Sequence, residues 1–291
     1  MRRLVPIILL VAALAVGIRI GWRPPHVEPL VGPVLRVDII DVGQGDSILI
    51  RTPDGADALI DAGERDYGPK VVDYLRQMGV RRLDLVVMSH PHSDHIGGMP
   101  AVLEAFPVAR VFDSGYAHGS AVQEHVLRLI EAGKIPYRRA RSGTVVSLGA
   151  HTRLEVLAPP DRLLRGTNSD ANNNSVVIRL VFGRVRMLFT GDIEREGEGR
   201  LIASRRDLES QVLKVAHHGS SDSTSLELLR LVRPDYVVIS VGAHNEYGHP
   251  SRKTLRRLSK ERTGAELFRT DKNGTVRFLT DGRRIVVEKG R

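Results

Sequence analysis

Short apolar segments alternate with amphipathic segments along most of this chain. Residues 35–39 alternate apolar with polar side chains, and short apolar runs at 47–51, 58–60 and 85–88 also predict β-strands. Apolar residues at helical spacing in 69–78 predict a helix that ends before Gly79. The same patterns predict helices over 100–105, 120–132, 195–205, 225–232 and 251–262, and strands over 110–112, 152–157, 176–182, 185–189, 212–216 and 236–241, with short strands to the end. This alternation indicates a layered α/β fold.

Several predicted strands end in a residue that can bind a metal ion. His90, Asp192 and His217 each follow an apolar strand, and His249 follows a strand after a short loop. In α/β proteins, strand ends and the loops after them build the functional site. We therefore expect one shared cleft. Asp61 also ends a strand, and beside a metal site it is predicted to orient a ligand histidine.

The densest group of candidate ligands follows the apolar run 85–88. His90, His92, Asp94 and His95 fall within six residues, and two glycines follow shortly after them. Imidazole and carboxylate together suit zinc, manganese or iron. The group therefore predicts a metal site.

Met1 is followed by two arginines and then by an apolar run from 4 to 22 that only Pro6 and Arg19 interrupt. A membrane-spanning helix needs about 20 apolar residues. Residues 1–22 are therefore predicted to form a transmembrane anchor or signal segment, with a buried helix as the alternative. The arginines keep the N-terminus inside, which would place the rest outside the cytoplasm, either held at the cell membrane or secreted. Residues 23–33 are predicted to be a proline-rich linker, and 34–291 the folded domain.

Composition narrows the possible functions. The formal net charge of +9 favours polyanionic partners such as nucleic acid or anionic lipid. The absence of cysteine excludes disulfides, cysteine-ligated zinc and a thiol nucleophile. A hydrophobic content of 42% is typical of a globular protein.

The histidine-rich group, His-x-His-x-Asp-His, with the later Gly191-Asp192 and downstream histidines, resembles the metallo-β-lactamase superfamily. The resemblance extends from about residue 34 to the end. It implies a four-layer αββα sandwich and a hydrolase that holds two divalent metal ions. More narrowly, residues 41–46, 172–175, 213–220 and 247–250 are similar to the C-terminal domain of the ComEC/Rec2 competence proteins. Those proteins move DNA across a membrane, and their large polytopic membrane region is not represented in this sequence.

The resemblance also implies roles for individual residues. His90 and His92 would bind the first metal, and Asp94 and His95 the second, with Asp94 also catalytic. Asp192 would bridge the two ions. The last ligand position is assigned to His249.

Many superfamily hydrolases supply a further histidine to the first metal, between the opening group and the bridging aspartate. This chain has the asparagine run 172–174 in that interval. His118, His125 and His151 also lie there, in segments predicted to be helix or loop surface. The first metal is therefore expected to be under-coordinated, labile or completed by His217. A weaker nitrogen set favours manganese alongside zinc.

His217 and His218 are adjacent, so on a strand they would point to opposite faces. The alternation of side chains along a strand does not decide which of them binds metal. We assign His217 to the metal, and we assign His218 the catalytic role of protonating a leaving group or contacting a phosphate.

Two metal ions can activate water without a serine or cysteine nucleophile, which suits phosphodiesters, esters or lactams. Three features favour phosphodiesters: Lys214 beside the histidine pair, a helix expected to open at Gly219–Ser221, and a basic helix after His249. The basic residues of that helix are Arg252, Lys253, Arg256, Arg257 and Lys260. We therefore predict a nuclease-like hydrolase linked to DNA uptake. The alternatives are a thioesterase, lactonase or β-lactamase, and a non-catalytic DNA-binding module of the envelope.

Overall fold

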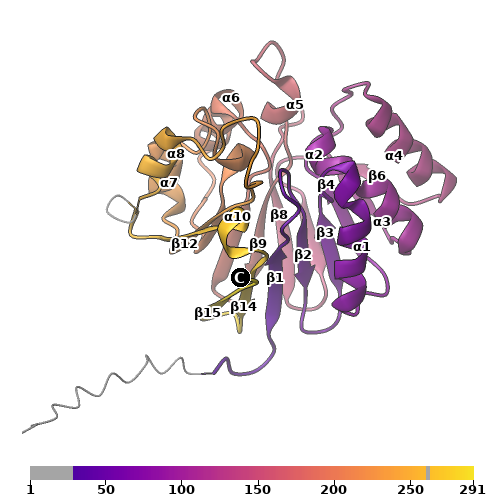
Figure 1. Cartoon of the computed structure of the whole chain (residues 1–291), viewed down its shortest axis with the longest axis horizontal. Helices are drawn as coiled ribbons and strands as arrows, with labels where there is room; N and C mark the ends of the chain where they lie inside the picture. Colours follow the sequence, from indigo (N-terminus) through magenta and orange to yellow (C-terminus); the bar gives the residue numbers. More distant parts are fainter. Residues whose placement is uncertain (1–28, 260–262) are drawn as a thin grey trace, which may run out of the picture.

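Two mixed β-sheets pack face to face at the centre of the molecule (Figure 1). The structure is a computed structural model that describes residues 29–259 and 263–291. The strands of the first sheet are β1 (Leu35–Ile39), β2 (Ile48–Arg51), β3 (Asp57–Ile60), β4 (Leu85–Met88), β5 (Val111–Asp113), β6 (Tyr137–Arg139), β14 (Val276–Thr280) and β15 (Ile285–Lys289). Those of the second are β7 (Val145–Leu148), β8 (Thr152–Ala158), β9 (Val177–Phe182), β10 (Val185–Phe189), β11 (Val212–Lys214), β12 (Tyr236–Ile239) and β13 (Glu266–Arg269). The strand orders are β15-β14-β1-β2-β3-β4-β5-β6 and β13-β12-β11-β10-β9-β8-β7.

Alternation along the strands explains why both faces of each sheet are covered. In β4, Leu85 and Val87 point into the core between the sheets, whereas Val86 and Met88 point to the outer helices. In β10, Met187 faces the inner core and Leu188 the opposite layer. Successive strand side chains point to opposite faces, so a strand apolar at every position is buried on both sides.

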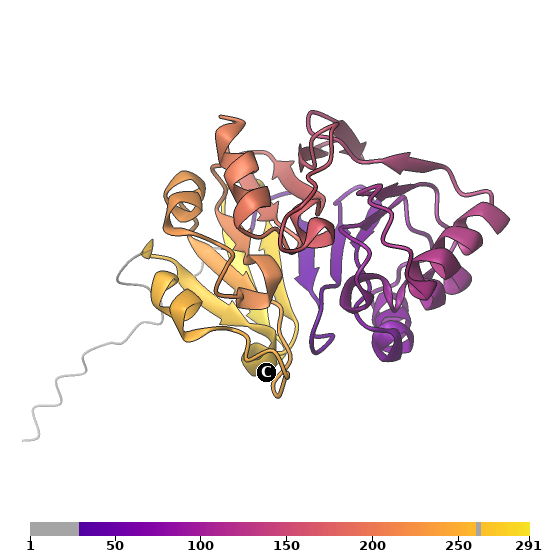
Figure 2. The same cartoon turned by 90° about the horizontal axis from the view of Figure 1, so that it is seen from above.

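Helices cover the outer face of each sheet, in the arrangement seen in Figures 1 and 2. The first sheet is covered by α1 (Gly68–Gln77), α3 (Met99–Ala105) and α4 (Ala121–Ala132), and the second by α6 (Arg195–Ala203), α7 (Leu226–Val232) and α8 (Arg252–Arg257). The shorter helices are η1 (Arg65–Tyr67), α2 (Ser93–Ile96), α5 (Asp170–Asn173), η2 (Ala216–Gly219) and α10 (Thr270–Asn273). The predicted four-layer αββα architecture is confirmed.

Serine caps fix the starts of three outer helices. The side chain of Ser120 accepts a hydrogen bond from the backbone N–H of Gln123 at the start of α4. Ser225 and Ser251 do the same for α7 and α8. Such caps satisfy backbone donors that have no partner inside the helix. The polar side chain before each apolar helical pattern thus marked these boundaries in the sequence.

Some predicted elements were wrong. The strand expected over 212–216 ends at Lys214, because the chain then turns into η2. Gly219–Ser221 does not open a helix, since α7 begins only at Leu226. The helix after His249 ends at Arg257, well short of the predicted end, and 260–262 lie outside the described residues.

Strands β6 and β7 were not predicted at all. All three residues of β6 are exposed, and those of β7 alternate between exposed and buried over only four residues. Both strands lie at the edge of their sheets. An edge strand that is fully exposed, or that alternates over only four residues, gives too weak a pattern to be recognised in sequence.

The predicted anchor or signal segment, 1–22, and most of the linker lie outside the described residues. Within 29–259 and 263–291, no helix is long and apolar enough to cross a membrane.

Candidate metal centre

Parallel neighbouring strands bring distant parts of the sequence to one edge of the sandwich. Strand β3 runs parallel to β4, and β10, β11 and β12 run parallel to one another. Their carboxyl ends therefore deliver Asp61, His90, Asp192 and His218 to the same region. A cleft of about 430 Å³ lies there, and three of the expected residues, Asp192, His217 and His249, line it, whereas His90 and Asp61 are buried and do not. Its lining includes His92, Asp94, Asp192, His217, His218 and His249.

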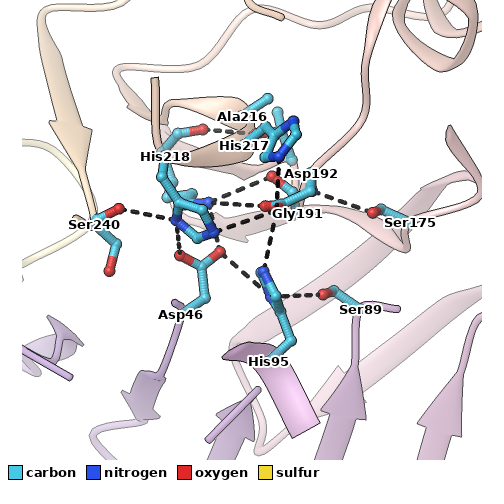
Figure 3. Close-up of polar contacts among 12 residues, drawn as sticks. Asp46, Ser89, His95, Ser175, Gly191, Asp192, Ala216, His217, His218 and Ser240 are labelled. Carbon is cyan, nitrogen blue, oxygen red and sulfur yellow. Dashed lines mark hydrogen bonds and ion pairs between the residues drawn. The ribbon is translucent and has the colours of Figure 1, made fainter. Parts of the chain in front are cut away.

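Asp192 lies at the centre of this site, as Figure 3 shows. Its Oδ2 atom is 3.2 Å from Nε2 of His95 and 3.2 Å from Nε2 of His218. The Nε2 atoms of His90 and His217 are each 4.0 Å from the same oxygen. Four imidazole rings therefore point a nitrogen at one buried carboxylate oxygen.

Asp94 completes a compact group of four ligand atoms. Its Oδ2 is 3.1 Å from Nε2 of His218 and 3.6 Å from Nε2 of His95. The ligand atoms of Asp94, His95, Asp192 and His218 all lie within 4.8 Å of one another. Since His95 comes from the first half of the chain and Asp192 and His218 from the second, neither half forms this group alone (Figure 3).

Asp61 orients His95, as predicted. Its Oδ2 accepts a hydrogen bond of 2.8 Å from Nδ1 of His95, and its Oδ1 accepts one of 2.7 Å from the backbone N–H of Ser89. Burial raises the pKa of Asp61, although His95 and Ser89 oppose that change. The contact leaves Nε2 of His95 directed at Asp192, which is the usual use of a carboxylate behind a ligand histidine.

His90 and His92 form the other half of the centre. Nε2 of His90 is 3.0 Å from Nδ1 of His92, and Nδ1 of His90 is 3.1 Å from Oγ of Ser89. Burial lowers the pKa of His90 well below its usual value and also lowers that of His92. Both rings are therefore neutral near pH 7, which is the form that binds metal.

Only one asparagine of the run 172–174 lines the cleft. Asn172 donates to Oε1 of Glu194 at 2.8 Å, and its own Oδ1 is buried without a hydrogen-bond partner in the described part of the chain. Asn173 caps the start of α6, where its Oδ1 accepts from the backbone of Glu194 and Gly197. The side chain of Asn174 accepts a hydrogen bond from the backbone N–H of Leu164 and donates one to its carbonyl. Within the run, Asn172 is thus the residue that lines the cleft and has an amide oxygen without a partner.

The three other histidines of that interval are exposed, as predicted for helix or loop surface. His118 lies at the cleft, with its ring centroid 5.3 Å from that of His92. His125 belongs to α4 and His151 to the turn before β8, and neither lines the cleft.

The structure gives His217 and His218 different surroundings. They do not lie on a strand, so the expectation of opposite strand faces was wrong. Both have left-handed backbone angles in η2, with φ of 49° and 51°. His218 donates from Nδ1 to the carbonyl of Ser240 at 2.9 Å and points Nε2 at Asp94 and Asp192. His217 instead places Nδ1 3.3 Å from Oε1 of Glu194, a residue that the sequence did not single out.

His249 lies in the same cleft but outside the compact group of four. Its ring centroid is 5.4 Å from that of His217, and its Nδ1 is buried with no hydrogen-bond partner among the described residues. Burial, together with His217 and His218, lowers its pKa to about 4. The assignment of His249 as last metal ligand stays a prediction, as do the assignments of His217 as ligand and His218 as catalytic group.

Lys214 does not face the cleft, contrary to its predicted place near the substrate. Its side chain is fully buried, with Nζ 2.5 Å from Oδ2 of Asp46 and 3.8 Å from Oδ1 of Asp192. Asp46 in turn lies 3.6 Å from Nδ1 of His218. Lys214 therefore compensates the negative charge beneath the centre and cannot contact a substrate.

Gly45 allows the turn that carries Asp46 to approach Asp94. Its φ of +119° favours glycine, and a Cβ there would collide with the carbonyl oxygen of Asp94. Asp46 donates its backbone N–H to that oxygen at 3.2 Å. The glycine-rich turn was visible in the sequence, but its aspartate was not recognised as part of the centre.

These donors fit a divalent metal. Nε2 of His95 and Oδ1 of Asp192 are buried and form no hydrogen bond within the described residues. Buried polar atoms normally have partners, and imidazole nitrogen with carboxylate oxygen suits zinc or manganese. The buried histidine–aspartate group is therefore a metal-site-like cluster.

Metal binding is expected to displace at least one proton from the metal-free protein. Burial alone would lower the pKa of His218, but Asp192 and Asp94 raise it to about 10. His218 belongs to the compact group of four, and a histidine that binds metal must lose its proton, so the apparent metal affinity should rise with pH towards that value. Isothermal titration calorimetry with zinc or manganese in buffers of different ionisation enthalpy measures the release. A binding heat that is the same in every buffer would contradict the expectation.

Residues 40–244 match the family model described as "Metallo-beta-lactamase superfamily". The chain is 32% identical over 262 residues to ComE operon protein 3 of Bacillus subtilis, covering 83% of this chain and 32% of that protein. It is 35% identical over 245 residues to competence protein ComA of Neisseria gonorrhoeae, with 83% and 32% covered. The chain thus spans about a third of the length of these relatives.

Solved structures share the fold at low sequence identity. The metallo-beta-lactamase fold protein YhfI from Bacillus subtilis aligns with a TM-score of 0.53 and 15% identity, covering 84% of this chain and 99% of that one. At this identity the likeness shows the fold alone.

Proposed function

This chain belongs to the metallo-β-lactamase superfamily, and from that premise we propose that it is a two-metal hydrolase that cleaves phosphodiesters. The observation that carries the proposal is the convergence of four imidazole nitrogens on Oδ2 of Asp192, at 3.2 to 4.0 Å. A carboxylate that faces histidines on two sides is suited to lie between two ions. Two bound divalent ions would supply Lewis acidity and activate a water molecule for hydrolysis.

The residues divide into two sets on this proposal. His90 and His92, with Asp192, would hold the first ion, and Asn172 Oδ1 is the nearby buried oxygen without a partner. Asp94, His95 and His218, with Asp192, would hold the second ion, because these four ligand atoms form the compact group. His218 is thus the proposed metal ligand and His217 the proposed catalytic group, which reverses the assignment made from the sequence.

His217 is then free to act on the substrate. Its Nδ1 lies 3.3 Å from Oε1 of Glu194 but forms no hydrogen bond within the described residues, and its Nε2 lies 4.0 Å from Oδ2 of Asp192. A ring beside the reaction centre can contact a phosphate oxygen or transfer a proton to a leaving group.

Nucleic acid is the proposed substrate. One relative is named competence protein ComA, another ComE operon protein 3, and a third, from Haemophilus influenzae, recombination protein 2. The net charge of +9 favours a polyanion. Arg252, Lys253 and Arg256 are exposed on α8, which begins shortly after His249. Two features of the sequence no longer support a nucleic-acid substrate, because Lys214 is buried and no helix begins at Gly219–Ser221.

We also retain the proposal that residues 1–22 anchor the protein in the cell membrane or direct its export. The hydrolase domain would then act outside the cytoplasm, where incoming DNA is accessible.

Cleavage assays with the full chain test the proposed reaction. Substrates are single-stranded DNA, duplex DNA, bis-p-nitrophenyl phosphate and nitrocefin, each with zinc or manganese. We expect metal-dependent cleavage of the phosphodiesters, lost on chelation and in His90→Ala. His151→Ala, which removes an exposed histidine outside the cleft, should retain full activity.

The alternatives give different results in the same assay. Cleavage of nitrocefin with no phosphodiester cleavage would replace this proposal with a lactam or ester hydrolase. Salt-dependent DNA binding that survives both chelation and His90→Ala, without cleavage, would indicate a non-catalytic DNA-binding module.

A further inference from the structure

Tyr247 is an exposed aromatic side chain at the mouth of the metal cleft. Its relative exposure is 70%. Among the large hydrophobic side chains exposed in the described part of the chain, Tyr247 alone lines this cleft. Single exposed hydrophobic residues are common on protein surfaces. A function for Tyr247 therefore depends on where the side chain lies and on how its loop is held.

Tyr247 is carried by a loop that is braced from within. This rim loop, residues 242–250, connects β12 to α8. The side chain of Asn245 donates to the carbonyls of Gly242 and His249, at 2.9 and 2.7 Å, and accepts from the backbone N–H of His249 at 2.9 Å. These bonds close the loop on itself and hold its tip in one arrangement.

Both ends of the rim loop are tied to the metal centre. Before the loop, Ser240 accepts from Nδ1 of His218 and donates from Oγ to the carbonyl of Gly45 at 2.7 Å. After the loop, the backbone N–H of Ser251 donates to the carbonyl of Gly219 at 2.9 Å. The position of Tyr247 is therefore fixed relative to the centre, which reduces the entropy that binding must remove.

A row of rings connects Tyr247 to the buried carboxylate. The Tyr247 ring stacks on His249, with centroids 5.9 Å apart and planes at 26°. His249 meets His217 edge to face at 5.4 Å, and Nε2 of His217 lies 4.0 Å from Oδ2 of Asp192. A ligand that reaches the centre through this side of the cleft passes an aromatic face first and imidazole groups next.

We propose that Tyr247 is a stacking platform for an unpaired base of a single-stranded nucleic acid whose backbone enters the metal cleft beside His249. The proposal rests on the phosphodiester hydrolysis proposed above, and it adds the group that recognises the strand. A planar base offers a π face to the exposed side of the tyrosine ring, while the adjoining phosphate lies towards the imidazoles. Stacking of this kind tolerates every base, because each has a π face.

The same geometry disfavours an intact duplex. Paired bases in a duplex are already stacked on their neighbours, so a base must be unpaired before its face can contact Tyr247. The cleft volume of about 430 Å³ lies in the range of small-ligand pockets, about 300–1,000 Å³. We therefore expect the site to prefer single strands and strand ends.

Binding and cleavage by the full-length protein test this separately. Fluorescence anisotropy with a fluorescein-labelled oligothymidylate, in the presence of calcium, measures binding. Cleavage of the same strand with manganese gives kcat and KM. Tyr247→Ala is expected to raise Kd and KM about tenfold with little change in kcat, and Tyr247→Phe should keep wild-type values because it retains the ring. Leu231→Ala, an exposed apolar residue of α7 outside the cleft, is the matched control.

A strand of abasic sites distinguishes stacking from a general effect on the loop. The wild-type protein should bind this strand about tenfold less tightly than the oligothymidylate, and Tyr247→Ala should bind both strands alike. If Tyr247→Ala cleaves and binds the oligothymidylate as the wild type does, the stacking platform is refuted and the proposed hydrolysis stands. Base- and Tyr247-dependent binding without cleavage would support the platform and refute hydrolysis. Absence of both binding and cleavage would refute both.

Discussion

Asp192→Asn is expected to reduce metal-dependent phosphodiester cleavage by at least about a thousandfold, since the loss of one electrostatic stabiliser alone costs about 10²–10³. The Asp192 side chain is almost fully buried, and four imidazole nitrogens face its Oδ2 at 4.0 Å or less. Asparagine keeps the shape of the side chain but removes the charge that two adjacent cations require. The variant should therefore bind fewer metal ions as well as losing activity. Metal content by mass spectrometry and kcat/KM on bis-p-nitrophenyl phosphate measure both effects.

Asp113→Asn is the matched control for this experiment. Asp113 is also a buried carboxylate at the end of a parallel strand, but it is bonded to Ser114, Gly115 and Tyr137 and does not line the cleft. Its substitution should lower stability without changing metal content. Full metal content together with a wild-type rate in Asp192→Asn would contradict the role given to Asp192.

Lys214→Met is expected to lower the free energy of unfolding of the metal-free protein by about 3–5 kcal/mol. Lys214 is fully buried, and its Nζ lies 2.5 Å from Oδ2 of Asp46 and 3.8 Å from Oδ1 of Asp192. Burial would lower the pKa of Lys214, but Asp46 and Asp192 raise it, so the amine stays charged. Methionine fills a similar volume and leaves the buried Asp46 carboxylate without its cation. Urea unfolding of the metal-free wild type and variant measures the difference.

The double variant Lys214→Met/Asp46→Asn separates the lost charge from the lost packing. A buried ion pair replaced at both ends by neutral groups of similar size often costs little. The double variant should therefore regain most of the stability lost in Lys214→Met. A single variant within about 0.5 kcal/mol of the wild type, the usual range for surface substitutions, would show that Asp46 does not need this cation.

The main elements of the fold were predictable because their patterns are strong. Strands such as β4 and β10 are apolar on both faces, since each lies between the inner core and a layer of helices. Helices such as α4 carry a buried stripe and a serine cap. By contrast, β6 is exposed at a sheet edge and depends on pairing with β5, which no local pattern reveals.

The histidine pair shows where local reasoning fails. A strand continued through His217 and His218 would place them on opposite faces, but both residues adopt left-handed backbone angles. Non-glycine residues are uncommon in that region, so the turn is held by its surroundings. These include the bond from His218 to Ser240 and that from the backbone of His217 to the carbonyl of Gly191.

By itself, the sequence determined the layered α/β sandwich, the edge at which the site forms, and the dense ligand group around Asp94. Hydrophobic periodicity and closely spaced ligands are local properties, so they can be read without the fold. Only the tertiary structure decided that His218 joins Asp94 and Asp192, that Lys214 lies beneath the centre against Asp46, and that Tyr247 stands at its mouth. Two of these relations, His218 with Asp94 and Lys214 with Asp46, join residues more than a hundred positions apart, and packing of the two sheets, with their parallel strands, sets them.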